Sequence, residues 1–403
     1  MPRPKLQHPT RSPTRSSAGD TFDAYAAVAP GLETLVAAEL KSLGVVPRLE
    51  VGGVEFKGSL EAIARANLWL RTASRVIVRS AAFRAQAFHE LERLARAVPW
   101  ERWVTPGAPV RFRITSRKSR LYHTGAIEQR LVEAIEHRLG VAPQTERTTG
   151  EDEENDSSRA QLFVVRAVHD AFTVSTDTSG ALLHMRGYRQ AIAKAPLRET
   201  LAAAMLIASG WTGDMPLIDP LCGSGTIAIE AALLARRMAP GLNRTFAFLA
   251  WPEMKTAIWE RLRDEAKDRA LPKAIASIEA SDRDRGAIDS ASANATRAGV
   301  HGDIEFSVRS LSAIDPSSNQ SGYVVTNPPY GIRVGEATKL RDLYARFGQI
   351  LRRNRPGWHL AMLSANPRLE RELRLPLEER FRTQNGGIPV RLVTSRVPTA
   401  AER

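Results

Sequence analysis

Apolar residues follow two different patterns along the chain. In the first half, short stretches alternate apolar and polar positions, as in residues 110–115 (Val-Arg-Phe-Arg-Ile-Thr). That alternation predicts a half-buried strand with one cationic face. From about Gly187 onwards, short apolar runs alternate with long helical stretches, which favours a parallel sheet. The chain should therefore contain a small α+β half followed by a larger α/β half.

The first half should form a compact unit. Its apolar runs are separated by turn signals, such as the Gly52-Gly53 pair. The strands are expected at residues 25–28, 54–56, 74–82, 110–115, 162–168 and 172–176. The helices are expected at residues 31–43 and 87–98.

Composition marks segments that should lie outside the packed core. Residues 1–20 are rich in Pro, Ser and Arg, which predicts a disordered basic tail. Residues 151–156 are acidic and are expected to be a flexible insertion in a loop. We therefore divide the chain into a tail (1–20), two segments of the first half (21–65 and 66–178) and a second domain (186–403).

The second half carries a glycine-rich turn between a strand and a helix. The strand at residues 216–219 ends in Asp219, and Gly223 and Gly225 precede a helix at residues 227–235. Glycines let such a turn fold tightly and bring backbone N–H groups to a ligand at the helix N-terminus. A single G-x-G is weak evidence, because many strand–turn–helix units have one for packing. The acidic strand end suits a cationic ligand group rather than a pyrophosphate.

The next acidic strand end is Asp282, which could hold ribose hydroxyls. It lies 59 residues beyond Gly223, whereas a dinucleotide fingerprint expects about 20. A helix at residues 256–269 lies in the gap, so an insertion explains it. The spacing disfavours a nicotinamide dehydrogenase.

A second motif, Thr326-Asn-Pro-Pro-Tyr-Gly331, follows a short apolar run. Proline has a fixed φ and pushes the preceding residue into an extended conformation, so the motif predicts a rigid rim at the end of a strand. The rim offers the Asn327 carboxamide oxygen and the Pro328 carbonyl as acceptors, and Tyr330 adds an aromatic face. Two acceptors beside a ring suit a planar base with an exocyclic amine. The alternative is a proline-rich turn without function.

Charge points to a polyanionic partner. The chain has 57 Lys and Arg residues against 44 Asp and Glu residues, a net charge of +13. Residues 71–138 alone contain 14 basic and 6 acidic side chains. Such a field attracts nucleic acid, and a solvated basic surface is the alternative.

Other function classes lose support from composition. No apolar run approaches the ~18–20 residues that span a bilayer, and the N-terminus lacks a signal-peptide pattern, so we expect a cytoplasmic protein without membrane contact. The single cysteine, Cys222, excludes a disulfide framework or a cysteine zinc site. The eight histidines show no ligand spacing, so no metal is expected.

The two motifs together resemble those of S-adenosylmethionine-dependent amino-methyltransferases of nucleic acids, which carry a D-P-x-x-G-S-G-T loop and an N/D/S-P-P-Y/F/W box. Further stretches are similar to the bacterial RNA guanine-N2 methyltransferases with a THUMP domain. These stretches are residues 69–75, 183–189, 195–204 and 239–244. The resemblance extends from about residue 22 to the C-terminus.

This resemblance implies a fold, a cofactor and a reaction. The fold would be an α/β, class I, Rossmann-like catalytic domain with a mixed seven-stranded sheet. A THUMP RNA-binding module (66–178) with a ferredoxin-like N-terminal segment (21–65) would precede it. The protein, expected as a monomer, would transfer a methyl group from S-adenosylmethionine to the N2 amine of a guanine, with 23S rRNA as the first candidate. A tRNA guanine and a DNA adenine N6 amine stay open as alternatives.

The resemblance also implies site residues. Those expected at the cofactor are Glu199, Asp219, Cys222, Gly223, Gly225, Thr226, Asp282 and Ser310. Asp219 would contact the methionine part and Asp282 the ribose. Ser310 stands where the family usually has an Asp near the adenine amine, and a serine hydroxyl would accept that hydrogen bond more weakly.

The remaining expected residues hold the target. Asn327, Pro328, Pro329 and Tyr330 would bind the flipped base. Those expected to contact RNA are Arg71, Arg75, Arg111, Arg113, Arg117, Lys118, Arg120 and His123. Covalent catalysis by Cys222 is rejected, because this residue lies in the cofactor loop.

Overall fold

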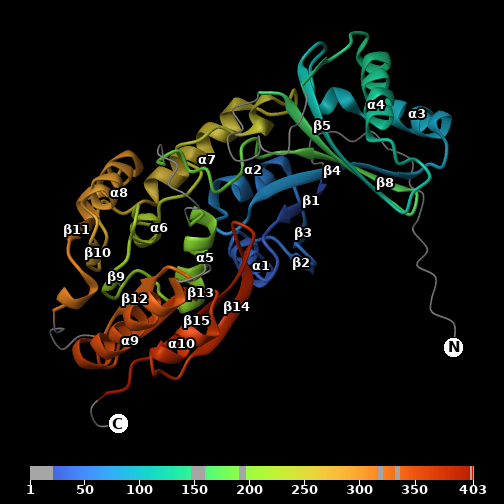
Figure 1. Cartoon of the computed structure of the whole chain (residues 1–403). Coiled ribbons are helices and arrows are strands. Elements are labelled where there is room, and N and C mark those ends of the chain that lie inside the picture. Colours follow the sequence, from blue (N-terminus) through green and yellow to red (C-terminus); the bar gives the residue numbers. More distant parts are fainter. Residues whose placement is uncertain are drawn as a thin grey trace.

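The computed structural model describes residues 21–146, 159–189, 197–315, 321–331, 336–399 and 402, without the side chains of residues 336–339. Two sheets, one in each half of the chain, form an elongated molecule (Figure 1). The basic tail and the acidic insertion expected from the sequence lie outside the described residues.

The first half forms an eight-stranded sheet with the order β2-β3-β1-β4-β8-β7-β5-β6. Its strands are β1 (Phe22–Ala27), β2 (Pro47–Glu50), β3 (Gly53–Gly58), β4 (Arg75–Arg84), β5 (Pro109–Arg117), β6 (Gln144–Thr145), β7 (Gln161–Val168) and β8 (Ala171–Asp177). Strand β4 pairs with both β1 and β8. The segments 21–65 and 66–178 therefore share one continuous sheet.

The described part of this half contains the helices α1 (Glu33–Ser42), α2 (Leu60–Trp69), α3 (Phe88–Arg96) and α4 (Thr124–Leu139). Helix α2 begins where the Ser59 side chain accepts a hydrogen bond from the Ala62 N–H at 3.3 Å. Helix α4 ends at Gly140, whose φ of +76° closes the last turn in the left-handed region. A short 3-10 turn, Trp100–Arg102, follows α3.

The second half forms a seven-stranded sheet with the order β11-β10-β9-β12-β13-β15-β14. Its strands are β9 (Leu217–Asp219), β10 (Ile278–Asp282), β11 (Ile304–Val308), β12 (Tyr323–Thr326), β13 (His359–Ser364), β14 (Glu378–Asn385) and β15 (Ile388–Arg396). Only β15 runs against the other six of these strands. The predicted mixed seven-stranded sheet is confirmed.

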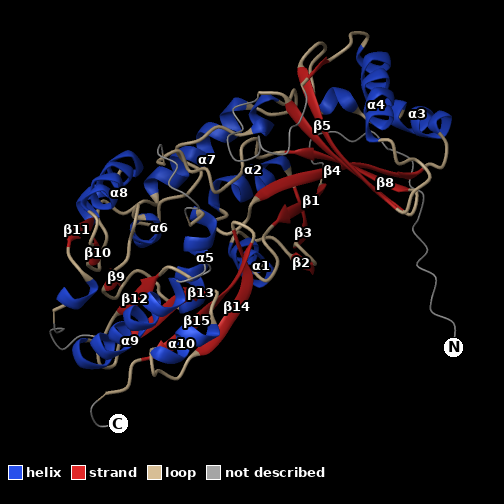
Figure 2. Ribbon diagram, viewed as in Figure 1, coloured by secondary structure: helices blue, strands red, loops and turns tan. Residues whose placement is uncertain are grey.

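Helices cover both faces of this sheet (Figure 2). They are α5 (Glu199–Ser209), α6 (Thr226–Ala235), α8 (Arg285–Ala298), α9 (Glu336–Asn354) and α10 (Pro367–Glu372). Helix α7 (Thr256–Asp268) lies beside α2 of the first half, where Glu265 pairs with Arg65 at 3.2 Å. Neighbouring strand residues point to opposite sides, and they enter different apolar clusters. Leu217 packs in the cluster of α5 and α6, whereas Ile218 packs in that of α9 and α10. Short 3-10 turns lie at Ala247–Ala250, His301–Asp303 and Leu311–Ala313.

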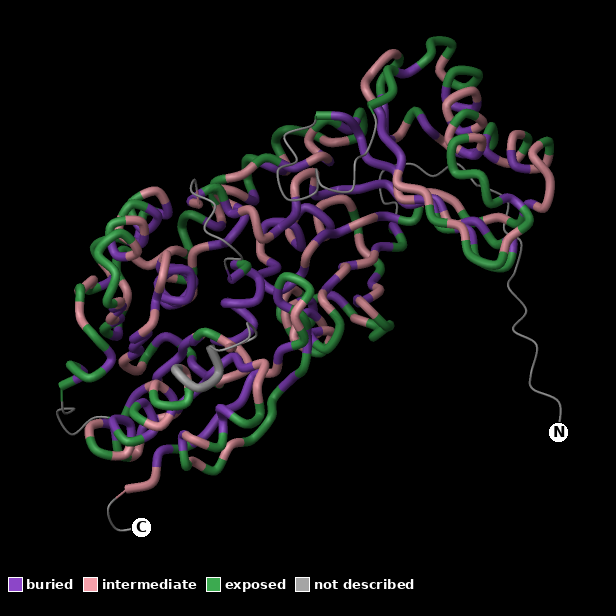
Figure 3. Tube along the Cα trace, viewed as in Figure 1, coloured by how far each residue is buried: buried purple, intermediate pink, exposed green. Residues whose placement is uncertain are grey.

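One buried apolar cluster joins the two halves. It contains Leu68 of α2 together with Phe246 and Phe248 of the second half. Figure 3 shows the buried backbone continuing from the first sheet into the second. Among the described residues, no helix has the length and apolarity to cross a membrane.

Candidate active site

Three neighbouring parallel strands bring the predicted motifs to one edge of the seven-stranded sheet. Asp219 ends β9, Asp282 ends β10 and Thr326 ends β12. The strands lie in the order β10-β9-β12, and the carboxyl ends of parallel strands form the ligand-binding edge of an open α/β sheet. Two hydrogen bonds confirm their proximity. The Thr326 hydroxyl donates to Asp219 Oδ1 at 2.8 Å, and the Gly223 N–H donates to Asp282 Oδ2 at 3.1 Å.

The glycine-rich turn is folded tightly against the next strand and helix. The Cys222 N–H donates to the Ser281 carbonyl at 3.0 Å, which ties the turn to β10. Gly225 has a φ of +82°, and a Cβ added there would lie 2.8 Å from the Ala291 Cβ of α8. Gly223 also has a positive φ, of +52°, but a Cβ there would meet nothing within 4 Å. Gly225 is therefore needed for packing, whereas Gly223 leaves open space where a ligand can approach the backbone.

Asp219 is a buried carboxylate held by two donors. The Leu221 N–H reaches its Oδ1 at 3.3 Å, and the Thr326 hydroxyl reaches the same atom at 2.8 Å. Burial raises the pKa of Asp219 to about 7, and the nearby charge of Asp282 acts in the same direction. A carboxylate that is costly to ionise alone gains from a cationic ligand.

Asp282 is half-buried and accepts two backbone hydrogen bonds. Besides the Gly223 N–H, the Asp284 N–H donates to its Oδ1 at 3.0 Å. The side chain of Asp284 in turn accepts from the Gly286 N–H at 2.8 Å and caps α8. These bonds fix the Asp282 carboxylate at the strand end with lone pairs left for ligand hydroxyls.

Glu199 lies at the start of α5 and is 2% exposed. Its Oε1 is 3.4 Å from Arg189 Nε, whereas its Oε2 is buried without a hydrogen-bond partner among the described residues. Burial raises the pKa of Glu199 to about 7. Arg189 also donates to the Thr226 hydroxyl at 2.7 Å, which links Glu199 to the start of α6. The orphaned oxygen is suited to a cationic donor from a ligand.

Two further residues predicted at the cofactor, Ser310 and Cys222, make fewer contacts at this edge of the sheet. Ser310 follows β11 and is exposed, with its hydroxyl 2.8 Å from that of Ser312. The preceding Arg309 N–H donates to the Asp282 carbonyl at 3.0 Å, so Ser310 lies near the same edge. Burial raises the pKa of the Cys222 thiol far above its usual range. A neutral buried thiol is no nucleophile, in agreement with the rejection of covalent catalysis.

The Asn-Pro-Pro-Tyr box is held by side chains from outside it. The Tyr330 hydroxyl donates to Asn327 Oδ1 at 2.6 Å, and the Asn385 amide donates to the Tyr330 oxygen at 3.1 Å. The Tyr344 hydroxyl of α9 donates to the Pro329 carbonyl at 3.1 Å. Pro328 is buried and Pro329 is exposed. The sequence suggested only a stacking face for the tyrosine, so its hydroxyl contacts are new information.

Three of the arginines expected at RNA are buried inside the protein. Arg71 donates to the Met238 carbonyl at 2.5 Å, and Arg75 pairs with Asp177 at 2.6 Å. Arg111 is 5% exposed in β5. Because a buried guanidinium cannot reach phosphates, we no longer expect these three residues to contact RNA. Arg71 instead joins the end of α2 to the second half, and Arg75 joins β4 to the end of β8 and the residues after it.

The other predicted cations lie on or beside one exposed loop after β5. Arg117, Lys118, Arg120 and His123 are exposed, and Arg113 is partly buried within the strand. Asp170 shapes the loop, since its Oδ1 accepts from the Arg120 N–H at 2.7 Å. This bond and its neighbours lower the pKa of Asp170. Tyr122, 65% exposed, has its ring centroid 4.2 Å from that of His123, an aromatic pair that the sequence did not single out.

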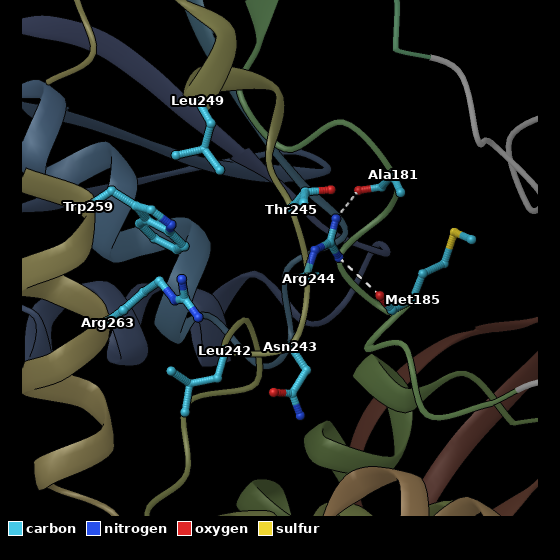
Figure 4. A pocket seen from close by; sticks show the side chains of 9 residues that line it. All are labelled: Ala181, Met185, Leu242, Asn243, Arg244, Thr245, Leu249, Trp259 and Arg263. Carbon is cyan, nitrogen blue, oxygen red and sulfur yellow. Dashed lines mark hydrogen bonds between the residues drawn. The ribbon is translucent and has the colours of Figure 1, made fainter. Parts of the chain in front are cut away.

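A separate cavity of about 710 Å³ lies between the linker after β8 and α7 (Figure 4). Arg244 lines it and donates to the Leu182 carbonyl at 2.8 Å and to the Ala181 carbonyl at 2.5 Å. The stretch at residues 239–244 therefore fastens the linker to the second domain. None of the residues predicted at the cofactor or target base lines this cavity. The described residues also contain no group of three or more His, Cys, Asp or Glu side chains arranged to hold a metal.

The fold and this edge define a class I, S-adenosylmethionine-dependent methyltransferase. The orphaned Glu199 oxygen and the open backbone at Gly223 fit a cofactor with cationic groups. The chain belongs to the RMKL-like methyltransferase family, whose domain model matches residues 186–394. A second model, the RlmL ferredoxin-like domain, matches residues 23–77. The predicted family, fold and cofactor are thereby confirmed.

Individual relatives agree with this assignment. The ribosomal RNA large subunit methyltransferase K/L of Syntrophotalea carbinolica is 36% identical over 92% of this chain and 53% of its own length, so the chain spans about half of that relative. A Listeria monocytogenes crystal structure named a predicted N6-adenine-specific DNA methylase has a TM-score of 0.81 at 35% identity, covering 94% of this chain and 97% of that one. The structure of SMU.472, solved with SAH, has a TM-score of 0.82 at 30% identity, covering 94% and 99%.

Proposed function

We propose that the protein methylates the exocyclic N2 amine of a guanine in RNA, with large-subunit ribosomal RNA as the first candidate. The observation that carries the proposal is the hydrogen bond between Thr326 and Asp219 at 2.8 Å. It joins the strand end of the cofactor site to the residue before Asn327. The groups suited to a target amine therefore lie beside the groups suited to a cationic cofactor.

The reaction is a direct displacement in which the bound cofactor supplies an activated methyl group on a sulfonium. Glu199 and Asp219 would compensate its positive charge, and Asp282 would hold its ribose. Asn327 Oδ1 and the Pro328 carbonyl would accept the two amine hydrogens, which aims the nitrogen lone pair at the methyl carbon. Positioning of this kind can replace acid–base chemistry, because it turns two reactants into near neighbours. No strong base is needed, since the methylated amine readily loses its proton to water.

The target base must leave its stack to reach this edge. Extrusion costs a few kcal/mol, and stacking on an aromatic ring returns about 1–3 kcal/mol. Tyr330 is the aromatic residue of the box and is partly exposed. We assign it the stacking surface for the extruded base.

Structured RNA is the proposed partner of the first half. Arg117 at the end of β5 and Lys118 and Arg120 in the loop that follows are all exposed. Ser119 in this loop supports the backbone by donating to the Arg117 carbonyl at 3.2 Å. Cations beside hydroxyls suit phosphates and 2′-hydroxyls. The THUMP assignment of residues 66–178 is part of this proposal.

Two alternatives use the same box. A tRNA guanine would need no change in the chemistry. A DNA adenine N6 amine presents the same two hydrogens, and the name of the Listeria relative refers to that reaction. RNA is favoured by the name of the Syntrophotalea relative and by the match of the first segment to an RlmL domain.

Mass spectrometry of nucleosides distinguishes these candidates. The protein would be incubated with labelled S-adenosylmethionine and, separately, ribosomal RNA, tRNA and duplex DNA lacking the modification. Labelled N2-methylguanosine from ribosomal RNA would support the proposal. N6-methyladenine from DNA, or no labelled nucleoside from any RNA, would refute it.

A further inference from the structure

The hairpin of β14 and β15 brings a polar side chain to the target-base box from the far edge of the sheet. Two strands, β13 and β15, separate β14 from β12 in the sheet order. The hairpin turns at Gly386 and Gly387, with φ values of +56° and +80°. Asn385, the last residue of β14, is 7% exposed, and its amide donates to the Tyr330 oxygen at 3.1 Å.

The direction of the hydrogen bonds follows from the donors available. The Tyr330 oxygen accepts from Asn385 and has a single hydrogen of its own, which it donates to Asn327 Oδ1 at 2.6 Å. Burial raises the pKa of Tyr330 to about 12, so the phenol keeps this hydrogen at neutral pH. Accepting one bond polarises the hydroxyl and strengthens the bond that it donates.

The consequence for Asn327 is a fixed carboxamide. A carbonyl oxygen has two lone pairs, and Tyr330 occupies one of them. The second stays available to a target amine, and its direction is set by the bond to the tyrosine. Tyr344 fixes the adjoining backbone by its bond to the Pro329 carbonyl at 3.1 Å.

The hairpin itself is held by the first half of the protein. Gly31, in the turn before α1, has a φ of +91°, and a Cβ added there would lie 1.8 Å from the Arg382 carbonyl oxygen of β14. Backbone therefore packs directly on backbone. Figure 1 shows β14 extending beside this N-terminal segment. Asn385 therefore lies on a strand that packs against the first half at Arg382, three residues before it.

We propose that Asn385 is a positioning residue for methyl transfer, which acts through the Tyr330 hydroxyl to orient the amine-binding oxygen of Asn327. The proposal rests on the proposed function, since it assumes that Asn327 holds the target amine. It gives the tyrosine a second task, because the hydroxyl aligns the carboxamide while the ring stacks on the base.

A double-mutant cycle tests this coupling. Asn385→Ala and Tyr330→Phe should each lower kcat about five- to tenfold, the effect expected when one neutral positioning hydrogen bond is lost. The KM for S-adenosylmethionine should stay unchanged in both. The double variant should be no slower than Tyr330→Phe alone, because both changes break the same chain of bonds. The neighbouring Gln384, exposed on the same strand, provides the control Gln384→Ala, which should leave kcat unchanged.

The isosteric variant Asn385→Asp adds a second measurement, the pH dependence of kcat. A purely structural role of Asn385 would not change this pH dependence. An ionised carboxylate would draw the tyrosine hydrogen away from Asn327, whereas a protonated one can donate as the amide does. Its kcat relative to wild type should therefore rise as pH falls. This comparison does not depend on the folding of the alanine variant.

The outcomes of these experiments separate the positioning role of Asn385 from the proposed function. Additive losses in the cycle, unchanged kcat in Asn385→Ala, or a pH-independent ratio for Asn385→Asp would overturn the proposal. Failure of the proposed function looks different, because nucleoside mass spectrometry would then find no labelled N2-methylguanosine in RNA treated with the wild-type protein. An inactive Asn327→Ala protein together with normal Asn385 variants would reject only the positioning role.

Discussion

Replacing Asp219 with Asn should stabilise the cofactor-free protein and weaken cofactor binding. Burial raises the pKa of this carboxylate from 3.8 to about 7. At about 1.4 kcal/mol per pH unit, that difference amounts to about 4 kcal/mol when the folded protein is fully ionised at this site. Because the folded pKa is raised, the unfolded chain releases this proton first. The contribution of Asp219 to the free energy of unfolding is therefore largest below about pH 4, and it is lost as the pH rises through 7.

The assay is urea unfolding, followed by circular dichroism, of wild type and Asp219→Asn between pH 5 and pH 8. Over that range this single group should remove about 2–3 kcal/mol from the free energy of unfolding of wild type. The variant should lose that component. Glu199, whose pKa burial likewise raises to about 7, remains and keeps part of the slope. The exposed Asp268 supplies a control, since Asp268→Asn makes the same change of side chain away from the buried strand ends.

Calorimetry completes the comparison, because the amide cannot compensate a cationic ligand. Asp219→Asn should bind S-adenosylmethionine more weakly by about 1.5–3 kcal/mol, the loss expected for a hydrogen bond to a charged group. A variant less stable than wild type at pH 8, with a parallel pH dependence, would refute this reasoning. So would undiminished cofactor affinity.

Three other substitutions test the cofactor site, the basic loop and the packing of the first half on β14 independently. Asp282→Ala should weaken cofactor binding in calorimetry by about 1.5–3 kcal/mol, and unchanged affinity would remove this residue from the site. Replacing the three cations at residues 117–120 should weaken RNA binding and flatten its salt dependence in filter-binding titrations, with cofactor affinity unchanged. An unaltered salt slope would make the loop a solvated face. Gly31→Ala should lower the free energy of unfolding by about 1–3 kcal/mol, since the new Cβ would overlap the Arg382 carbonyl oxygen. Gly44→Ala, which has a similar φ of +81° but nothing within 4 Å of the added Cβ, should cost less, and equal costs would contradict the packing argument.

The sequence predicted those parts of the site that are local in the chain. The turn from Asp219 to Thr226 and the box from Asn327 to Tyr330 each combine a strand end with residues of restricted conformation. Such motifs consist of residues that are close together in the sequence. Parallel strands then bring their carboxyl ends to one edge, which a strand–helix alternation already implies.

Contacts between distant segments escaped prediction. Asn385 lies 55 residues from Tyr330. The adjacent glycines could predict the hairpin turn but not which residue the asparagine reaches. The burial of Arg75 depends on Asp177 and on the Gly180 carbonyl, 105 residues away. The number of charges in a segment does not show whether an arginine is buried and paired inside the protein or exposed to RNA.

The central claim is that Asn327 holds the amine that is methylated. The direct test measures N2-methylguanosine formed per enzyme by Asn327→Ala, with ribosomal RNA and saturating S-adenosylmethionine, by nucleoside mass spectrometry. Pro328 is buried and the Pro329 carbonyl is bonded to Tyr344, so the rim should keep its shape in the variant. We predict unchanged cofactor affinity and a turnover lower by at least about 100-fold, the range for a lost polar contact to a reacting group. A variant that methylates its RNA at near the wild-type rate would contradict the account.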